Sequence, residues 1–125
     1  MSGRNLEAVI SALRTIRARR VGGEVAYLQP LVAEALDGAC VAYRREVRLG
    51  PRSRVDFLTD GGVAIEVKRG RPRSDALARQ LGRYASHDAV SAVVLVLERA
   101  VPLPDTMSGK PVRVVSLHML WGLAV

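Results

Sequence analysis

Hydrophobic positions in the first third of the chain recur at a helical spacing. A first helix is predicted over residues 5–19, with an apolar side formed by Leu6, Val9, Ile10, Leu13 and Ile16. A second helix is expected over residues 24–36, with Val25, Leu28, Val32 and Leu36 facing inward and Gly38 beyond its end. Pro30 falls inside this stretch and predicts an irregular first turn.

The rest of the chain alternates in the manner of strands, apart from one helix. Strands are predicted over 39–48, 54–58, 63–68, 91–97 and 112–117. Asp60-Gly61-Gly62 is a hairpin signal between the second and third of them. A helix from Ser74, its expected N-cap, to about Ser86 follows the third strand. The resulting order, α-α-β-β-β-α-β-β, predicts an α/β fold with a mixed sheet flanked by helices.

Length and composition limit the broad class of protein. The chain has 125 residues, 49% of them hydrophobic, which fits one domain with a core of its own. No apolar run is long enough to cross a bilayer, and the first residues lack the pattern of a secretory signal. The single cysteine, Cys40, cannot form an internal disulfide. We therefore expect a cytoplasmic protein without a membrane partner.

The charge balance favours a polyanionic partner. The formal net charge is +7, and Lys68 and Lys110 are the only lysines among 19 basic residues. Arginine suits bidentate contacts to phosphate, although a high-GC genome would produce the same bias. Lys68 is notable because it lies inside an apolar predicted strand of a chain in which nearly all other cations are arginines.

The predicted hairpin brings two acidic residues and this lysine together. Alternation places Glu66 and Lys68 on one face of the strand over 63–68. A three-residue loop at 60–62 pairs Thr59 with Val63 and puts Asp56 directly opposite Glu66. Adjacent carboxylates repel each other, and a divalent cation such as Mg²⁺ removes that penalty. The alternative is that Glu66 and Lys68 belong to a solvated face and pair with Arg54 or another neighbour.

These residues resemble a known catalytic signature. Arg54-Val55-Asp56-Phe57 followed by Ile65-Glu66-Val67-Lys68 is similar to the motif of the PD-(D/E)XK, or restriction-endonuclease-like, nuclease superfamily. The resemblance covers residues 24–97 and implies that Asp56 and Glu66 bind Mg²⁺, with Mn²⁺ as a substitute, and that Lys68 is the catalytic lysine. The chain departs from the pattern at Val55, where the superfamily's name indicates a proline.

Two further positions extend the resemblance. Gln80 and Tyr84 lie four residues apart on the helix after the hairpin, similar to the Q-x-x-x-Y motif of the RecB-like and lambda-exonuclease-like branch, where it supports the active site. The alternative is that Tyr84 packs in the core and Gln80 is incidental. Glu24 resembles the helix acid that other members, including archaeal Holliday-junction resolvases, add to the metal site, and Glu34 is its rival.

Basic residues near these positions are the expected DNA contacts. They extend from the catalytic strand and along the following helix, at Arg69, Arg71, Arg73, Arg79 and Arg83. The alternative is a solvated basic loop without an assigned role. The expected function is a Mg²⁺-dependent deoxyribonuclease, either exonuclease-like or a junction resolvase, in a homodimer or higher homo-oligomer. An inactive DNA-binding module with the same fold is the alternative. Residues 117–121 are a candidate oligomer interface, and the alternative is that they complete the core.

Overall fold

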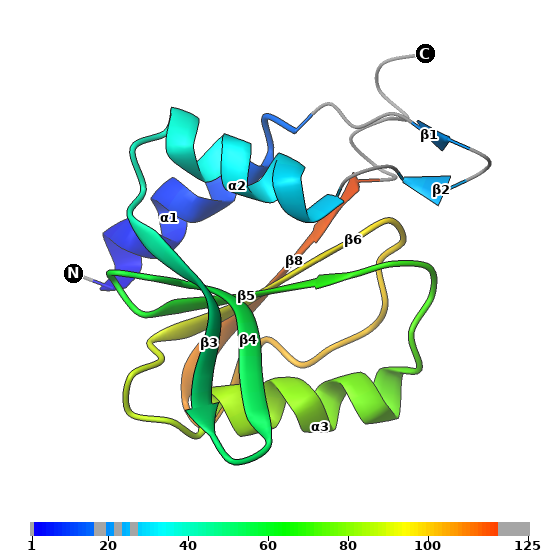
Figure 1. Ribbon diagram of the computed structural model, residues 1–125. Helices are drawn as coiled ribbons and strands as arrows, with labels where there is room; N and C mark the ends of the chain where they lie inside the picture. Colours follow the sequence, from blue (N-terminus) through cyan, green and yellow to red (C-terminus); the bar gives the residue numbers. More distant parts are fainter. Residues whose placement is uncertain (1, 17–19, 22–23, 26–27, 118–125) are drawn as a thin grey trace.

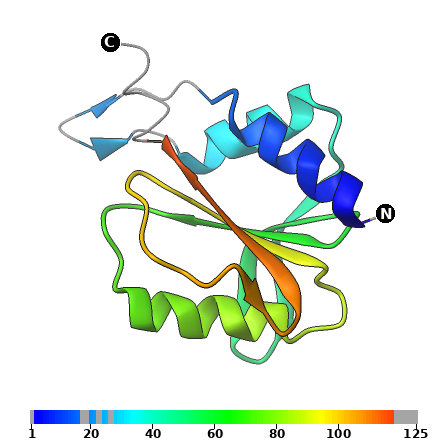
Figure 2. The ribbon, with the colours of Figure 1, turned by 180° about the vertical axis from the view of Figure 1, so that it is seen from behind.

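Helices cover both faces of one mixed β-sheet, so that the protein has three layers (Figure 1). The computed structural model describes residues 2–16, 20–21, 24–25 and 28–117, and of residues 2–4, 20–21 and 24–25 it describes the backbone alone. Helices α1 (Ser2–Leu13) and α2 (Leu28–Gly38) lie on one face of the sheet, and α3 (Ser74–Ala85) lies on the other, as the view from behind also shows (Figure 2). The α/β class with a mixed sheet, predicted from the order of the elements, is confirmed.

The sheet contains six strands in the order β3-β4-β5-β6-β8-β7. Their bounds are Tyr43–Gly50 for β3, Ser53–Thr59 for β4, Val63–Lys68 for β5, Ala92–Leu97 for β6, Thr106–Met107 for β7 and Lys110–Ser116 for β8. The pairs β3–β4, β4–β5 and β7–β8 are antiparallel, whereas β5–β6 and β6–β8 are parallel. Strand β6 is buried along its whole length, as its continuous apolar run predicts.

Two separate hydrophobic cores fill the spaces between the layers. Leu13 and Leu36 from the first two helices pack against Ile65 of β5 in one core. Leu81 and Tyr84 of α3 pack against Val93 and other residues of the opposite face in the second core. Because successive side chains of a strand point to opposite faces, β5 contributes to both cores and is fixed between them.

The first two helices are shorter than the periodicity predicts. Helix α1 ends at Leu13 and not at residue 19, because Thr15 donates from its hydroxyl to the carbonyl of Ala12 at 2.7 Å and a turn follows. Helix α2 begins at Leu28, which places Pro30 in its first turn, where proline is tolerated. Residues 17–19, which the prediction also assigned to the first helix, lie outside the described residues.

The prediction that Glu24 and Val25 begin the second helix is therefore wrong. The two residues form β2 (Glu24–Val25), which pairs with β1 (Arg20–Val21) in a two-stranded sheet. The expected strand at residue 39 begins at Tyr43, since the amide of Val41 still donates to the carbonyl of Leu36 in the turn that ends α2.

Two smaller expectations about the second half of the chain also need correction. Ser74 is the first residue of α3 and not its N-cap, a position that Arg73 occupies in an extended conformation without a side-chain cap. The short strand β7 lies between the last two predicted strands, where no strand was predicted, and it pairs with the start of β8. In the part of the chain that the structure describes, no helix is long and apolar enough to span a bilayer.

The loop between β4 and β5 sets the register of the central hairpin. Phe57 pairs with Ile65 and Leu58 with Ala64, which is the predicted register. Gly62 has a φ of +87°, the left-handed conformation expected at the end of this loop. A Cβ atom at Gly62 would lie 2.8 Å from the carbonyl oxygen of Ala89, so glycine is required there on two grounds.

Candidate active site

The register of the central hairpin carries Asp56 to a position opposite Glu66, one residue beyond the last regular pair. At this point the carboxylates replace the backbone ladder. The amide of Val67 donates to Asp56 Oδ2 at 2.8 Å, and the amide of Asp56 donates to Glu66 Oε1 at 3.4 Å. The two side chains thus occupy the place where the strands β4 and β5 separate, and each bonds to the backbone of the other strand there.

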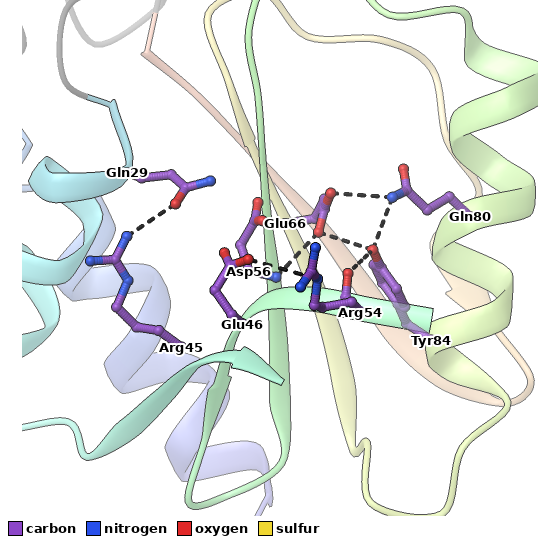
Figure 3. Close-up of polar contacts among 8 residues, drawn as sticks. All are labelled: Gln29, Arg45, Glu46, Arg54, Asp56, Glu66, Gln80 and Tyr84. Carbon is purple, nitrogen blue, oxygen red and sulfur yellow. Dashed lines mark hydrogen bonds and ion pairs between the residues drawn. The ribbon is translucent and has the colours of Figure 1, made fainter. Parts of the chain in front are cut away.

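Glu66 is a buried carboxylate whose two oxygens both have donors. Its side chain is 6% exposed, and Oε2 lies 3.1 Å from Lys68 Nζ. Gln80 donates from Nε2 to the same oxygen at 3.3 Å, and the hydroxyl of Tyr84 donates to Oε1 at 3.1 Å (Figure 3). The carboxylate is therefore held in one orientation by residues from β5 and α3.

Helix α3 supplies Gln80 and Tyr84 from the same side, one turn apart. Gln80 also donates to the hydroxyl of Tyr84 at 2.9 Å, and that hydroxyl lies 2.9 Å from the carbonyl oxygen of Arg54. The ring of Tyr84 is buried in the same core as Leu77 and Leu81. The ring of Tyr84 thus packs in the core, as one interpretation predicts, while its hydroxyl makes the contact with the carboxylate that the other interpretation requires.

The electrostatics of the pair disfavour two negative charges side by side. Burial raises the pKa of Glu66 above its ordinary value, and the nearby charge of Asp56 raises it further, against the opposing effect of Lys68. Burial also raises the pKa of Asp56, which is half-buried. Burial and the charge of Glu66 likewise raise the pKa of Tyr84, so its hydroxyl remains a donor. A cation between Asp56 and Glu66 would remove the penalty.

A third acid, Glu46 of β3, lies next to Asp56 on the other side. Arg45 pairs with Phe57 and Val47 with Val55, so Glu46 occupies the position across from Asp56. Its charge adds to the rise in the pKa of Asp56 that burial causes, and its carboxylate lies 3.8 Å from Arg54 Nε (Figure 3). Glu46 was not predicted from the sequence. Pairing the two strands on either side of the turn at 50–51 would have placed its neighbour Val47 opposite Asp56.

The outer hairpin changes faces at the level of Glu46. Its φ is +53°, which is uncommon for a residue other than glycine. Phe57, the partner of Arg45, belongs to the core beneath α1 and α2, whereas Val47 and its partner Val55 belong to the core beneath α3. Regular alternation would put Arg45 and Val47 on one face, so the change of faces occurs at the level of Glu46 and Asp56.

Of the two acids predicted to join the metal site, the structure places Glu34 away from this group. Glu24 lies in β2, and its side chain is outside the part that the structure describes, so its role in the metal site stays a prediction. Glu34 is exposed on α2, where it lines a hollow between α1 and α2 with Thr15 and Ile16. The acid beside Asp56 is Glu46 from a strand, and not Glu34 from the helix as one interpretation expected.

The predicted DNA-contact arginines all have exposed side chains. They are distributed over the β5–α3 loop and the outer side of α3, at Arg69, Arg71, Arg73, Arg79 and Arg83. Arg73 is bound to Asp75 at 3.0 Å, in a pair that is itself exposed. Of the expected interface over 117–121, Leu117 is buried in the core and residues 118–121 lie outside the described residues.

Asp56 and Glu66 are the residues of this group that can hold a hard divalent cation. Among the described residues, no three side chains of His, Cys, Asp and Glu gather in a metal-binding arrangement. Two carboxylates are nevertheless a common protein contribution to a Mg²⁺ site, in which water and substrate phosphate complete the shell. Their oxygen chemistry, their burial and their raised pKa values fit such an ion.

The contacts thus unite the five residues singled out as catalytic from the sequence, namely Asp56, Glu66, Lys68, Gln80 and Tyr84. Comparison with known proteins adds no relative to this picture, since the chain has no significant match among family models, curated proteins or solved structures.

Proposed function

We propose that this protein is a Mg²⁺-dependent deoxyribonuclease with a restriction-endonuclease-like fold. The observation that carries the proposal is the buried Glu66 carboxylate, which lies opposite Asp56 and contacts Lys68, Gln80 and Tyr84. A fold without a function in this region has little reason to bury an acid beside another acid, because each one disfavours the charge of the other. The pattern of raised pKa values in one place is typical of functional sites.

Asp56 and Glu66 would hold the metal ion, and the residues around them would control its position. When bound, Mg²⁺ would lower the pKa of a water molecule and stabilise negative charge on the phosphate during hydrolysis. Gln80 and Tyr84 hold the Glu66 carboxylate in a fixed orientation, which preserves the ligand geometry. Hydrolysis breaks one phosphorus–oxygen bond and adds water across it, which leaves a phosphate monoester and a hydroxyl.

Lys68 is the residue that we assign to the attacking water and the cleaved phosphate. Its ammonium group lies 3.1 Å from Glu66 Oε2 and its side chain is 28% exposed, so it is fixed at one end of the site and still accessible to substrate. A positive charge at this point would orient the nucleophile and stabilise charge that develops on the phosphate. The exposed arginines of the β5–α3 loop and α3 would supply further phosphate contacts without reading the base sequence.

A panel of labelled DNAs tests this function: linear duplex, single strand, flap and four-way junction, each with Mg²⁺ or Mn²⁺ and with EDTA. Wild type is compared with Asp56→Asn, which keeps the shape of the side chain but removes its charge. We expect cleavage by wild type that is lost in EDTA and reduced at least about a hundredfold in the variant. DNA binding without cleavage of any substrate would favour the inactive binding module instead.

A further inference from the structure

The side chain of Arg45 is held in place on the α2 side of Asp56. It donates through Nη2 to Gln29 Oε1 at 3.0 Å, and its Cζ atom lies 5.0 Å from the centroid of the Phe57 ring. Gln29 belongs to the first turn of α2, and Phe57 is fully buried in the core beneath it. Two contacts of different kinds, one polar and one cation–π, therefore restrict an otherwise exposed guanidinium.

Arg45 differs from other arginines near the site in how its charge is balanced. Arg54 lies 3.8 Å from Glu46, and Arg73 lies 3.0 Å from Asp75. Among the described residues, Arg45 forms no ion pair with a carboxylate, and Gln29 occupies only one of the five N–H donors of its guanidinium. The group is thus oriented but not neutralised.

The position of Arg45 relative to the carboxylates is equally specific. It lies on one side of Asp56 and Glu66, whereas Gln80 and Tyr84 lie on the other (Figure 3). Arg45 pairs across the sheet with Phe57, the residue that follows Asp56 on β4, so it lies one position from that carboxylate. A polyanion bound over the carboxylates would therefore meet Arg45 on the α2 side.

We propose that Arg45 binds a phosphate of the nucleic-acid backbone next to the phosphate that is cleaved. This inference rests on the proposed nuclease function and assigns the path of its substrate, which crosses the site from α2 to α3. A guanidinium matches two phosphate oxygens with two parallel N–H donors. Because Gln29 and Phe57 already restrict the side chain, less conformational entropy is lost when the phosphate binds.

The test measures the affinity for a short fluorescent duplex in EDTA, over a series of salt concentrations. The variants are Arg45→Ala, Gln29→Ala and, as the matched control, Arg44→Ala, which removes an exposed charge from the adjacent position of β3 on the opposite face. We expect Arg45→Ala to weaken binding about tenfold and to reduce the slope of log K against log salt by about 1. Gln29→Ala should weaken binding by a smaller factor without changing the slope, because the charge remains.

Equal effects of Arg45→Ala and Arg44→Ala, in variants with the melting temperature of wild type, would overturn this inference. Wild type that binds the duplex but cleaves none of the panel DNAs with Mg²⁺ would refute the nuclease, while the salt slopes would still decide whether Arg45 contacts phosphate. Wild type without affinity for the duplex or for any other DNA of the panel would refute both proposals.

Discussion

The hydroxyl of Tyr84 lies 3.1 Å from the carboxylate of Glu66, 18 residues earlier in the chain. This contact joins α3 to the central strand β5 at the point where the buried acid needs a donor. Gln80, one turn earlier on the helix, binds the other oxygen of the same carboxylate. The orientation of Glu66 is therefore set by the packing of α3 against the sheet, and a change in α3 should be measurable at the carboxylate.

Removal of this hydroxyl should destabilise the protein and alter Glu66. In Tyr84→Phe, the free energy of unfolding in urea should fall by about 1 to 2 kcal/mol, because a buried acceptor loses its donor. The pKa of Glu66 should rise further, since the hydrogen bond from Tyr84 lowers it. Tyr43→Phe is the control, because that side chain is only partly buried and its hydroxyl contacts the carbonyl of Ala33 at 3.5 Å and the carboxylate of Asp37, away from Glu66. Equal losses of stability in both variants would contradict the role of the Tyr84 hydroxyl.

Stability without metal should depend on pH through the two carboxylates. Burial raises the pKa values of Asp56 and Glu66 above their ordinary values of 3.8 and 4.5, so the folded protein binds these protons more tightly than the unfolded chain does. Their contribution to stability is therefore complete below the ordinary values and is lost as the pH rises through the raised ones. Urea denaturation of wild type and Glu66→Gln in EDTA measures the difference. The variant should lose less stability than wild type as the pH rises from about 4 to about 7. Parallel curves would show that Glu66 is not perturbed.

Divalent metal should reverse that penalty near neutral pH. A cation that binds only the folded state and is present at a concentration of about ten times its Kd stabilises the protein by about 1.4 kcal/mol. Wild type should therefore unfold at a higher temperature in Mn²⁺ or Mg²⁺ than in EDTA, and Asp56→Asn should show little of this increase. An equal increase in both proteins would place the metal elsewhere in the molecule.

The loop that sets the register of Asp56 and Glu66 should tolerate no side chain at its end. Gly62→Ala should lower the free energy of unfolding by more than about 1 kcal/mol, because Gly62 has a φ of +87° and its Cβ atom would lie 2.8 Å from Ala89 O. Gly82→Ala in α3 is the matched control, since a Cβ atom there meets no atom within 4 Å, and we expect a gain of about 1 kcal/mol. A stable Gly62→Ala protein would argue against the loop geometry.

Much of the central hairpin could be predicted from the sequence because its signals are local. The alternation in Val63–Lys68 defines a strand, and Gly62 fixes the length of the loop, so the position of Asp56 opposite Glu66 follows by counting. The spacing of Gln80 and Tyr84 likewise places both on one side of α3.

Glu46 could not be placed in the same way. A shift in the pairing of β3 and β4 between Arg48 and Gly50 moves the register by one residue, and counting from a simple turn would have put Val47 opposite Asp56. Both strands also change faces at the level of Glu46 and Asp56, where Glu46 is left-handed, and the sequence gives no sign of this change. The start of the second helix at Glu24 was wrong for a different reason, since periodicity predicts a helix but does not determine its first residue.

Cleavage by a pair of lysine variants tests the central claim most directly. Lys68 and Lys110 are the only lysines of the chain, and Lys110 donates to the carbonyl of His87 at 2.7 Å, a contact outside the group around Glu66. With the preferred DNA in Mg²⁺, Lys68→Ala should reduce the cleavage rate by about a hundredfold or more, as expected for the loss of one contact to the transition state. Lys110→Ala removes no such contact, and its rate should remain within about a few-fold of wild type. Wild-type cleavage that Lys68→Ala leaves unchanged would contradict the assignment of this site as the active site.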